Sequence, residues 1–146
     1  MPITHFSTDA EIERIWDGLL DRALPKREWT HAAHFAAALW LLRWRGDLNA
    51  PAAMPELIRA YNEATGVPNT DSDGYHETIT LASLRAARAM LALHWSEEPL
   101  SGIANALMAS PLGRSDWVLT YWTRELLFSP RARREWVPSN LKAFPF

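Results

Sequence analysis

Three histidines lie where two expected helices begin, and their spacing could bring them around a metal ion. His31 and His34 are three residues apart near the start of an expected helix over residues 30–45. Side chains three positions apart lie on one face of a helix, within reach of a single ion. His76 stands at the start of a second expected helix, over residues 76–95. The spacing therefore predicts a site in which His31, His34 and His76 bind one divalent metal ion.

The three-histidine site depends on how the two helices run. If the second, third and fourth helices of the chain run up, down and up, the second and fourth are parallel and begin at the same end of the bundle. Imidazole nitrogen suits zinc, iron and nickel alike, so the residue types do not choose among these metals. Three protein ligands would leave positions open for water or a substrate, as in catalytic metal sites. A polar cap on an apolar bundle, or a ligand site without metal, is the alternative.

Other polar side chains near His76 could carry a reaction. Glu77 follows it directly and is the candidate general base, although its carboxylate could equally do no more than complement the positive end of the helix dipole. Arg124 is expected to face inward and to clamp an anionic substrate, with a structural ion pair as the alternative. Three further side chains are expected to contact the substrate: Asn69, Tyr75 and Thr80. Together these residues predict a metal-dependent hydrolase or oxygenase that acts on a small molecule.

Composition restricts the classes of protein that this chain can belong to. The 146 residues fit one domain, expected over 1–146, and contain no cysteine, which excludes disulfides and thiolate chemistry. The formal net charge is −2, so a large basic surface for nucleic acid is not expected. No apolar run approaches the roughly 18 residues of a membrane span, and no signal peptide is expected. We therefore expect a cytoplasmic protein that binds neither nucleic acid nor membranes.

Apolar residues recur at helical spacing along most of the chain, and no stretch alternates as a strand does. This pattern predicts an all-α, single-domain bundle of five to seven helices. The expected helices cover residues 9–24, 30–45, 51–65, 76–95, 100–108, 116–128 and 130–136. Turn-forming residues at 66–74 predict a long loop before the fourth helix, which is expected to be central. The tail over 137–146 is expected to be extended and to pack back on the bundle.

Tryptophan is unusually frequent, and it supports a second interpretation of the protein. Its eight positions are 16, 29, 40, 44, 95, 117, 122 and 136. The rings could fill the core between alanine-rich helices, or they could line a pocket, because indole combines a large apolar surface with one N–H donor. A lined pocket predicts a non-catalytic module that binds an aromatic or apolar small molecule, with the histidines only as hydrogen-bond partners. A third possibility is an interaction subunit, such as a homodimer, that buries its aromatic surface against a partner.

Several linked motifs resemble a family of small uncharacterised bacterial proteins. They are Trp29-Thr30-His31-x-x-His34, Tyr61-Asn62-Glu63-Ala64-x-Gly66, Asn69-Thr70, Gly74-Tyr75-His76-Glu77-Thr78-Ile79-Thr80, Tyr121-x-x-Arg124-Glu125-x-Leu127-x-Ser129 and Trp136-Val137-Pro138. The resemblance covers about residues 27–141 and implies a grouping but no function. In the family pattern an acidic residue often follows the late proline. This chain has Ser139 and Asn140 there, so the resemblance assigns no role to such an acid.

Overall fold

The helix α2 (His31–Trp44) lies at the centre of the molecule because its sequence offers apolar or small side chains on almost every face. Eight of its 14 residues are buried. It packs against four other helices, which are α1 (Asp9–Leu20), α3 (Ala50–Ala64), α4 (Glu77–Ala92) and α5 (Leu100–Ala109). A helix surrounded in this way has little surface left for solvent, so the polar residues that it does carry need partners inside the protein.

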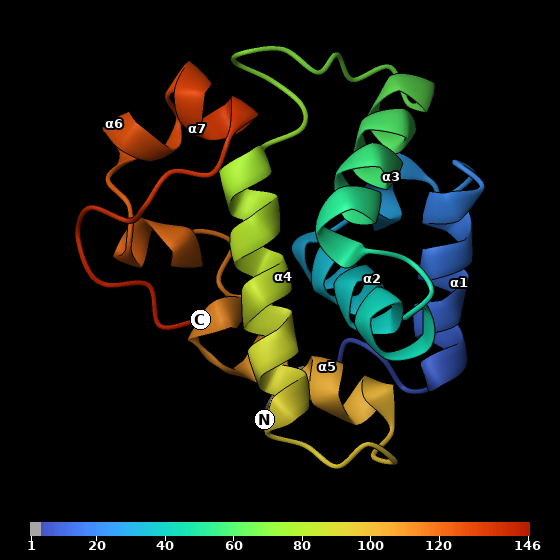
Figure 1. The fold of residues 1–146 in the computed structure, drawn as a ribbon. Helices are drawn as coiled ribbons and strands as arrows, with labels where there is room; N and C mark the ends of the chain where they lie inside the picture. Colours follow the sequence, from blue (N-terminus) through green and yellow to red (C-terminus); the bar gives the residue numbers. More distant parts are fainter. Residues whose placement is uncertain (1–3) are drawn as a thin grey trace.

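The computed structural model describes residues 4–146. Residues 1–3 lie outside the described part, and they belong to the N-terminal stretch in which no signal peptide is expected. Over the described residues the chain forms one compact domain of seven α-helices and three short 3-10 helices, without a strand. The all-α prediction is therefore confirmed. Within 4–146, no helix combines the length and the apolar composition that crossing a membrane requires. The two shortest α-helices, α6 (Arg124–Leu127) and α7 (Pro130–Arg134), are the last two in the sequence and lie at the upper left in Figure 1.

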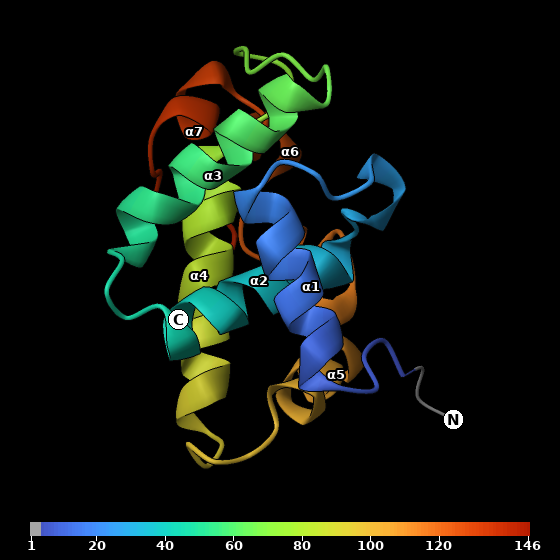
Figure 2. The same ribbon diagram turned by 90° about the vertical axis from the view of Figure 1, so that its right-hand side faces the viewer.

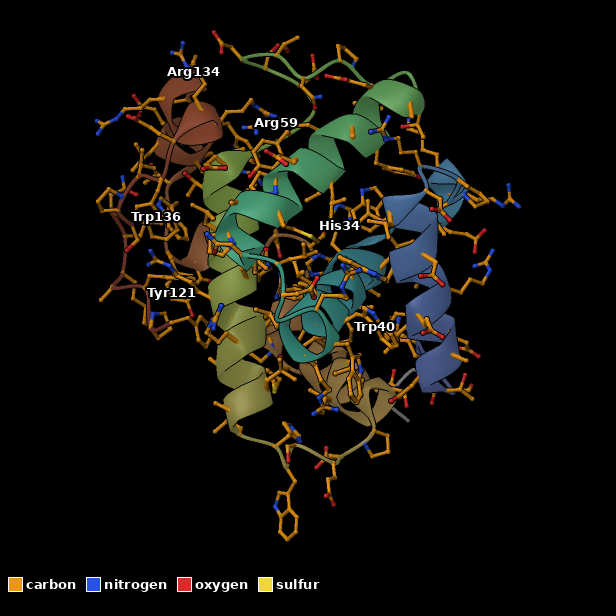
Figure 3. All side chains as sticks on the ribbon, turned by 45° about the vertical axis from the view of Figure 1, so that its right-hand side comes forward. His34, Trp40, Arg59, Tyr121, Arg134 and Trp136 are labelled. Carbon is orange, nitrogen blue, oxygen red and sulfur yellow. The ribbon has the colours of Figure 1, made fainter. Side chains whose placement is uncertain are left out.

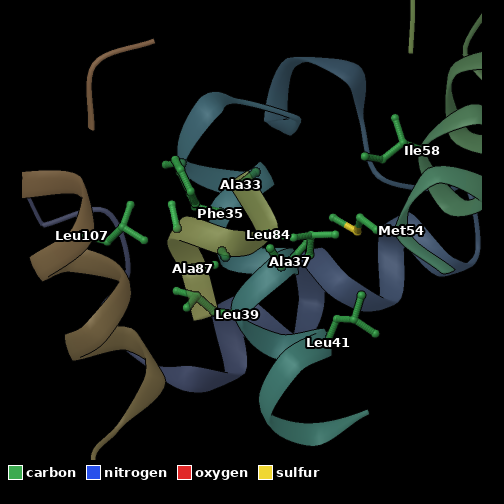
Figure 4. Close-up of a cluster of buried hydrophobic side chains, with 14 of the residues drawn as sticks. Ala33, Phe35, Ala37, Leu39, Leu41, Met54, Ile58, Leu84, Ala87 and Leu107 are labelled. Carbon is green, nitrogen blue, oxygen red and sulfur yellow. The ribbon is translucent and has the colours of Figure 1, made fainter. Parts of the chain in front are cut away.

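Helix α4 is the second central element, and it crosses α2 instead of running parallel to it. It packs against α2, α3, α5 and α7, and Figure 2 shows α2 lying across it. Small side chains let the two backbones approach closely, and Ala37 of α2 and Ala87 of α4 are fully buried in the core (Figure 4). Ridge-into-groove packing favours inclined crossings of this kind. The predicted parallel arrangement of these helices is therefore wrong, although the helices are neighbours.

The start of α1 shows how side chains fix both a helix end and a contact between helices. The hydroxyl of Thr8 accepts the N–H of Glu11 and so caps the helix. The carboxylate of Asp9 reaches the start of α5, where it accepts the N–H groups of Leu100 and Ser101 at 3.0 and 2.7 Å. Although burial by itself raises the pKa of Asp9, these backbone donors lower it overall.

The helix expected over 116–128 is wrong, because the chain instead forms a 3-10 helix over Trp117–Thr120, followed by the separate helix α6. Thr123 is extended, and its hydroxyl caps α6. The carbonyl of Tyr121 would accept a bond from within a continuous helix, but it accepts the backbone N–H of Asn140 from the tail at 3.2 Å. The tail therefore replaces the bonds that a longer helix would have made. No local sequence pattern indicates that the tail would supply these hydrogen bonds.

An aromatic cluster forms where the tail packs against the body, as the sequence predicts. Neighbouring rings have centroids between 5.1 and 6.3 Å apart, and they belong to Trp117, Tyr121, Trp122, Trp136 and Phe144. Trp122 is fully buried, and its indole N–H donates to the carbonyl of Val137 at 3.0 Å. Tyr121 and Trp136 are labelled in Figure 3. Several tryptophans are thus core residues, whereas Trp117 also borders a pocket.

Candidate functional site

Helix α2 begins with a threonine cap that leaves the two histidines free for other partners. The hydroxyl of Thr30 accepts the N–H of Ala33 at 3.2 Å. The Nε2–H of His31 donates to the carbonyl of Leu112 at 2.8 Å, and the Nδ1–H of His34 donates to the carbonyl of Thr30 at 2.7 Å. A carbonyl oxygen only accepts hydrogen bonds, so these two ring nitrogens carry the protons. In each neutral ring the other nitrogen, Nδ1 of His31 and Nε2 of His34, therefore keeps a lone pair.

The surroundings of His34 hold its imidazole neutral. The ring stacks on Trp29, with ring centroids 3.8 Å apart. Burial lowers the pKa of His34 to about 4, the bond to the Thr30 carbonyl opposes this shift, and the nearby His31 adds to it. At neutral pH the side chain is therefore an uncharged hydrogen-bond acceptor through Nε2.

A pocket of about 290 Å³, here called the histidine pocket, opens beside these two imidazoles. It lies between the first turns of α2, the first two turns of α4 and the segment around Trp117. Its lining residues are His31, His34, Phe35, Ile79, Ser83, Ser115, Trp117 and Val118. The wall is mostly apolar and aromatic, and Phe35 and Trp117 pack with centroids 6.1 Å apart. The two serine hydroxyls and the two imidazoles supply the polar contacts.

A larger pocket of about 490 Å³ shares Trp117 with the histidine pocket, but its chemistry is weaker. Its charged lining consists of Arg114 and Asp116, which pair with each other at the surface, together with Lys142. Exposed ion pairs of this kind contribute little binding energy. The histidine pocket is therefore the stronger candidate site, because its polar groups are fixed by backbone carbonyls and face an apolar wall.

His76 has a different role, because both of its ring nitrogens are bound to the backbone. The residue is extended, and its Nδ1 accepts the N–H of Ile79 at 3.2 Å, so the imidazole itself caps α4. Its Nε2–H donates to the carbonyl of Leu127 at 2.6 Å. Burial lowers the pKa of His76, the Leu127 bond opposes this shift, and Arg133 adds to it. The side chain is 7% exposed, so it is a buried cap that ties α4 to the end of α6.

The structure brings His31 and His34 to one pocket but does not group His76 with them. Over residues 4–146, no set of three or more histidine, aspartate or glutamate side chains is arranged to hold a metal ion. Ligation by all three histidines would require His76 to give up at least one backbone bond. The starts of α2 and α4 both border the histidine pocket, but the imidazole of His76 is bound to the carbonyl of Leu127 and does not line that pocket. The three-histidine metal site stays a prediction.

The residues expected to bind substrate form a second group, around the loop before α4. The Tyr75 hydroxyl donates to the carboxylate of Glu77, and the hydroxyl of Thr80 is a further neighbour. Burial raises the pKa of Tyr75, the Glu77 bond raises it further, and Thr80 opposes the shift. The Oδ1 of Asn69 accepts the N–H of Tyr75 at 3.0 Å. These four residues therefore lie together, but none of them lines the histidine pocket.

Gly74 is required at the turn into α4. Its φ is +81°, a conformation that side chains disfavour, and an added Cβ would lie 2.3 Å from the carbonyl oxygen of Pro68. The amide of Asn69 fastens the same loop to α3, because it accepts from Asn62 and donates to the carbonyl of Arg59 at 3.0 and 3.1 Å. The loop that carries Tyr75 is therefore built by specific contacts.

The arginines are placed differently from the sequence prediction. Arg124 is exposed on α6 and lines neither pocket described above, so the expectation that it faces inward is wrong. The prediction of an inward side chain assumed a continuous helix over 116–128, and that helix does not form. Arg133 lies on α7 in a basic run with Arg131 and Arg134, and it donates to the carbonyls of Gly74 and Tyr75 at 3.0 and 3.4 Å. Its position between helical residues gave no local signal of these long-range contacts.

No family model, no curated protein and no solved structure matches this chain. The resemblance to a family of small bacterial proteins therefore stays a prediction that rests on the motifs alone.

Proposed function

We propose that this protein is a binding module whose histidine pocket takes a small aromatic or apolar molecule that carries a hydrogen-bond donor. The observation that supports this function is the pair of backbone-fixed imidazoles at the edge of an aromatic wall. A pocket of about 290 Å³ is near the lower end of the range for small-molecule sites, about 300–1,000 Å³. This volume favours a ligand of one or two rings.

The lone pairs of the two imidazoles give the proposed ligand its chemistry. Nε2 of His34 and Nδ1 of His31 can each accept an N–H or O–H from the ligand, and the low pKa of His34 keeps that ring uncharged. An apolar body would pack against Phe35 and Trp117. A buried acceptor without a partner is costly, so a ligand that lacks the donor binds more weakly than one that has it.

The test compares phenol with toluene, which have the same ring but differ in the O–H donor. Binding is followed through the backbone ¹⁵N–¹H spectrum during titration of the metal-free protein. We expect phenol to bind about threefold to tenfold more tightly than toluene, which is the value of one hydrogen bond. Signals of the residues that line the histidine pocket should move together.

Matched variants separate the acceptor from the ring. His34→Phe keeps an aromatic ring against Trp29 but has no lone pair, so phenol should lose most of its advantage over toluene, and His31→Phe tests the second acceptor. His5→Phe changes an exposed histidine outside the pocket and should leave that advantage intact. If neither probe shifts the pocket signals, or if His34→Phe and His31→Phe both leave the preference for phenol unchanged, the proposed function is wrong.

A metal ion is the second candidate occupant, and one observation favours it. The two lone pairs lie on one face of α2, and neutral imidazole nitrogen is a metal ligand. The test is elemental analysis after loading with zinc, iron or nickel, beside His34→Ala and His76→Asn. Metal lost only in His34→Ala supports a site at the start of α2, whereas metal also lost in folded His76→Asn supports the three-histidine site. No metal in the wild-type chain after loading contradicts both.

A further inference from the structure

A separate pocket of about 270 Å³, here called the arginine pocket, lies where the loop before α4 meets α3 and α7. Its lining residues are Arg59, Asn69, Thr70, Asp71, Tyr75, Arg133 and Arg134. Three guanidinium groups and one carboxylate give this lining a formal charge of +2. Figure 3 shows Arg59 and Arg134 at one end of the molecule, with His34 nearer its middle. The concentration of cations contrasts with the whole chain, whose net charge is −2.

The guanidinium of Arg59 is positioned by a tyrosine that is itself fixed. Its central carbon lies 4.3 Å from the centre of the Tyr75 ring, a cation–π distance. The Tyr75 backbone N–H is held by Asn69, and its hydroxyl is held by Glu77. Because stacking leaves the edge of a guanidinium available, Arg59 can present N–H donors to the pocket at a reduced cost in conformational entropy.

Arg133 contributes a donor that lacks a partner. Its Nη1 donates to the carbonyls of Gly74 and Tyr75, which fixes the side chain against the loop. Its Nε is buried, and among the buried side-chain nitrogen and oxygen atoms of residues 4–146 it is the one without a hydrogen-bond partner. Buried donors in proteins are almost always satisfied by protein, water or a ligand. Arg133 also lines the arginine pocket, so an acceptor oxygen of a ligand bound there is a candidate partner for Nε.

We propose that the arginine pocket binds an oxyanion, namely the phosphate group of a small molecule. Guanidinium forks match the oxygens of phosphate in geometry and charge, and three of them converge on this pocket. Asp71 is the competitor for the same site. Its Oδ1 lies 3.6 Å from Nε of Arg134, and both side chains are largely exposed, so the pair is weak and an oxyanion can replace it.

The experiment measures the binding of inorganic phosphate and of phenyl phosphate to the full chain by ¹⁵N–¹H NMR titration at low ionic strength. We expect signals of the loop before α4 and of α7 to move. Arg59→Gln and Arg134→Gln should each weaken binding about threefold to tenfold, as for a partly exposed charge-assisted bond. The control is Arg131→Gln, which removes the same charge from α7 at a residue that pairs with Glu135 and does not line the pocket.

A variant that binds phosphate more tightly gives a stricter test, because damage to the fold cannot increase affinity. Asp71→Asn removes the competing carboxylate and should tighten phosphate binding about threefold, whereas Asp73→Asn makes the same charge change outside the pocket lining and should have less effect. Tighter binding of phenyl phosphate identifies a phosphate ester as the ligand class, and equal binding identifies the free ion. Absence of binding by both probes at millimolar concentration, or equal effects of the pocket and control variants, would overturn the proposal.

Discussion

The starts of α2 and α4 carry the same residue type and use it in opposite ways. At α2 the cap is the hydroxyl of Thr30. His31 and His34 each donate from one ring nitrogen to a backbone carbonyl, and the other ring nitrogen keeps its lone pair. At α4 the cap is His76 itself, and both ring nitrogens are bound to the backbone. Two helix starts with similar sequence patterns therefore differ in what they can offer a ligand.

This difference shows that the capping residue decides whether a neighbouring histidine is available. A helix start has unpaired backbone N–H groups, and some side chain must accept them. When a threonine does so, nearby imidazoles remain available for a pocket. When the imidazole does so, its Nδ1 is used, and the remaining nitrogen is fixed as a donor. The predictions below test this contrast, from the largest expected effect to the smallest.

Replacement of the α4 cap should cost the most stability. His76→Ala leaves the Leu127 carbonyl and the Ile79 N–H without their side-chain partner in a buried environment, so we expect a loss of about 3 kcal/mol. For a chain of this size the melting temperature should fall by on the order of 10 °C. Denaturant unfolding followed by circular dichroism measures the free energy.

Two variants sharpen this result. His76→Asn supplies a good capping side chain but cannot reach Leu127, so it should recover about 1 kcal/mol relative to His76→Ala. His31→Ala gives up one part-buried bond, to the carbonyl of Leu112, and should cost about 1 kcal/mol. Equal losses in His76→Ala and His31→Ala would contradict the contrast between the two helix starts.

The stability of the metal-free protein should depend on pH through His34. Its folded pKa of about 4 is below the unfolded value near 6.5, so the unfolded state binds more protons between these values. The contribution of His34 to the free energy of unfolding is fully present above pH 6.5. It decreases by about 3 kcal/mol as the pH falls to about 4. His76, whose pKa is also lowered, changes stability in the same direction. Urea unfolding at pH 4, 5, 6 and 7 measures the slope.

The carboxyl groups of the protein also titrate at low pH, so the comparison with a variant isolates the histidine. Between pH 6.5 and pH 4 the free energy of unfolding of His34→Gln should depend on pH much less than that of the wild-type chain, because glutamine does not titrate. If the wild-type chain and His34→Gln lose stability in parallel over this range, His34 is not held neutral by burial and the proposed acceptor in the histidine pocket is lost.

The position of the proton on each imidazole ring gives the most direct test, because no side chain is changed, although the expected effect is the smallest. Long-range ¹⁵N–¹H spectra should show the proton on Nε2 in His31 and His76 and on Nδ1 in His34, each set by the carbonyl that it faces. Phenol should shift the unprotonated nitrogens of His31 and His34 and leave those of His76 unchanged. A His34 ring with its proton on Nε2 would contradict the assigned lone pair.

Local signals in the sequence predicted the helix starts well. Three helices begin within one residue of the expected position, and each is capped by the residue before it, namely Thr8, Thr30 or Ser129, because a cap involves residues only two or three positions apart. The helix expected over 116–128 failed for the opposite reason. Its interruption depends on bonds between Thr123, Tyr121 and the tail at Asn140, which local spacing does not encode.

The sequence by itself determined the all-α class, most helix starts, the apolar character of α2 and the shared face of His31 and His34, because these follow from interactions within a few residues. Only the tertiary structure decided that α2 crosses α4, that both nitrogens of His76 are engaged, and that Arg59 and Arg133 share a pocket while Arg124 faces solvent. These outcomes depend on which helix packs against which and on backbone carbonyls distant in sequence. The identity of a ring's partner, and thus its chemistry, is fixed at that level.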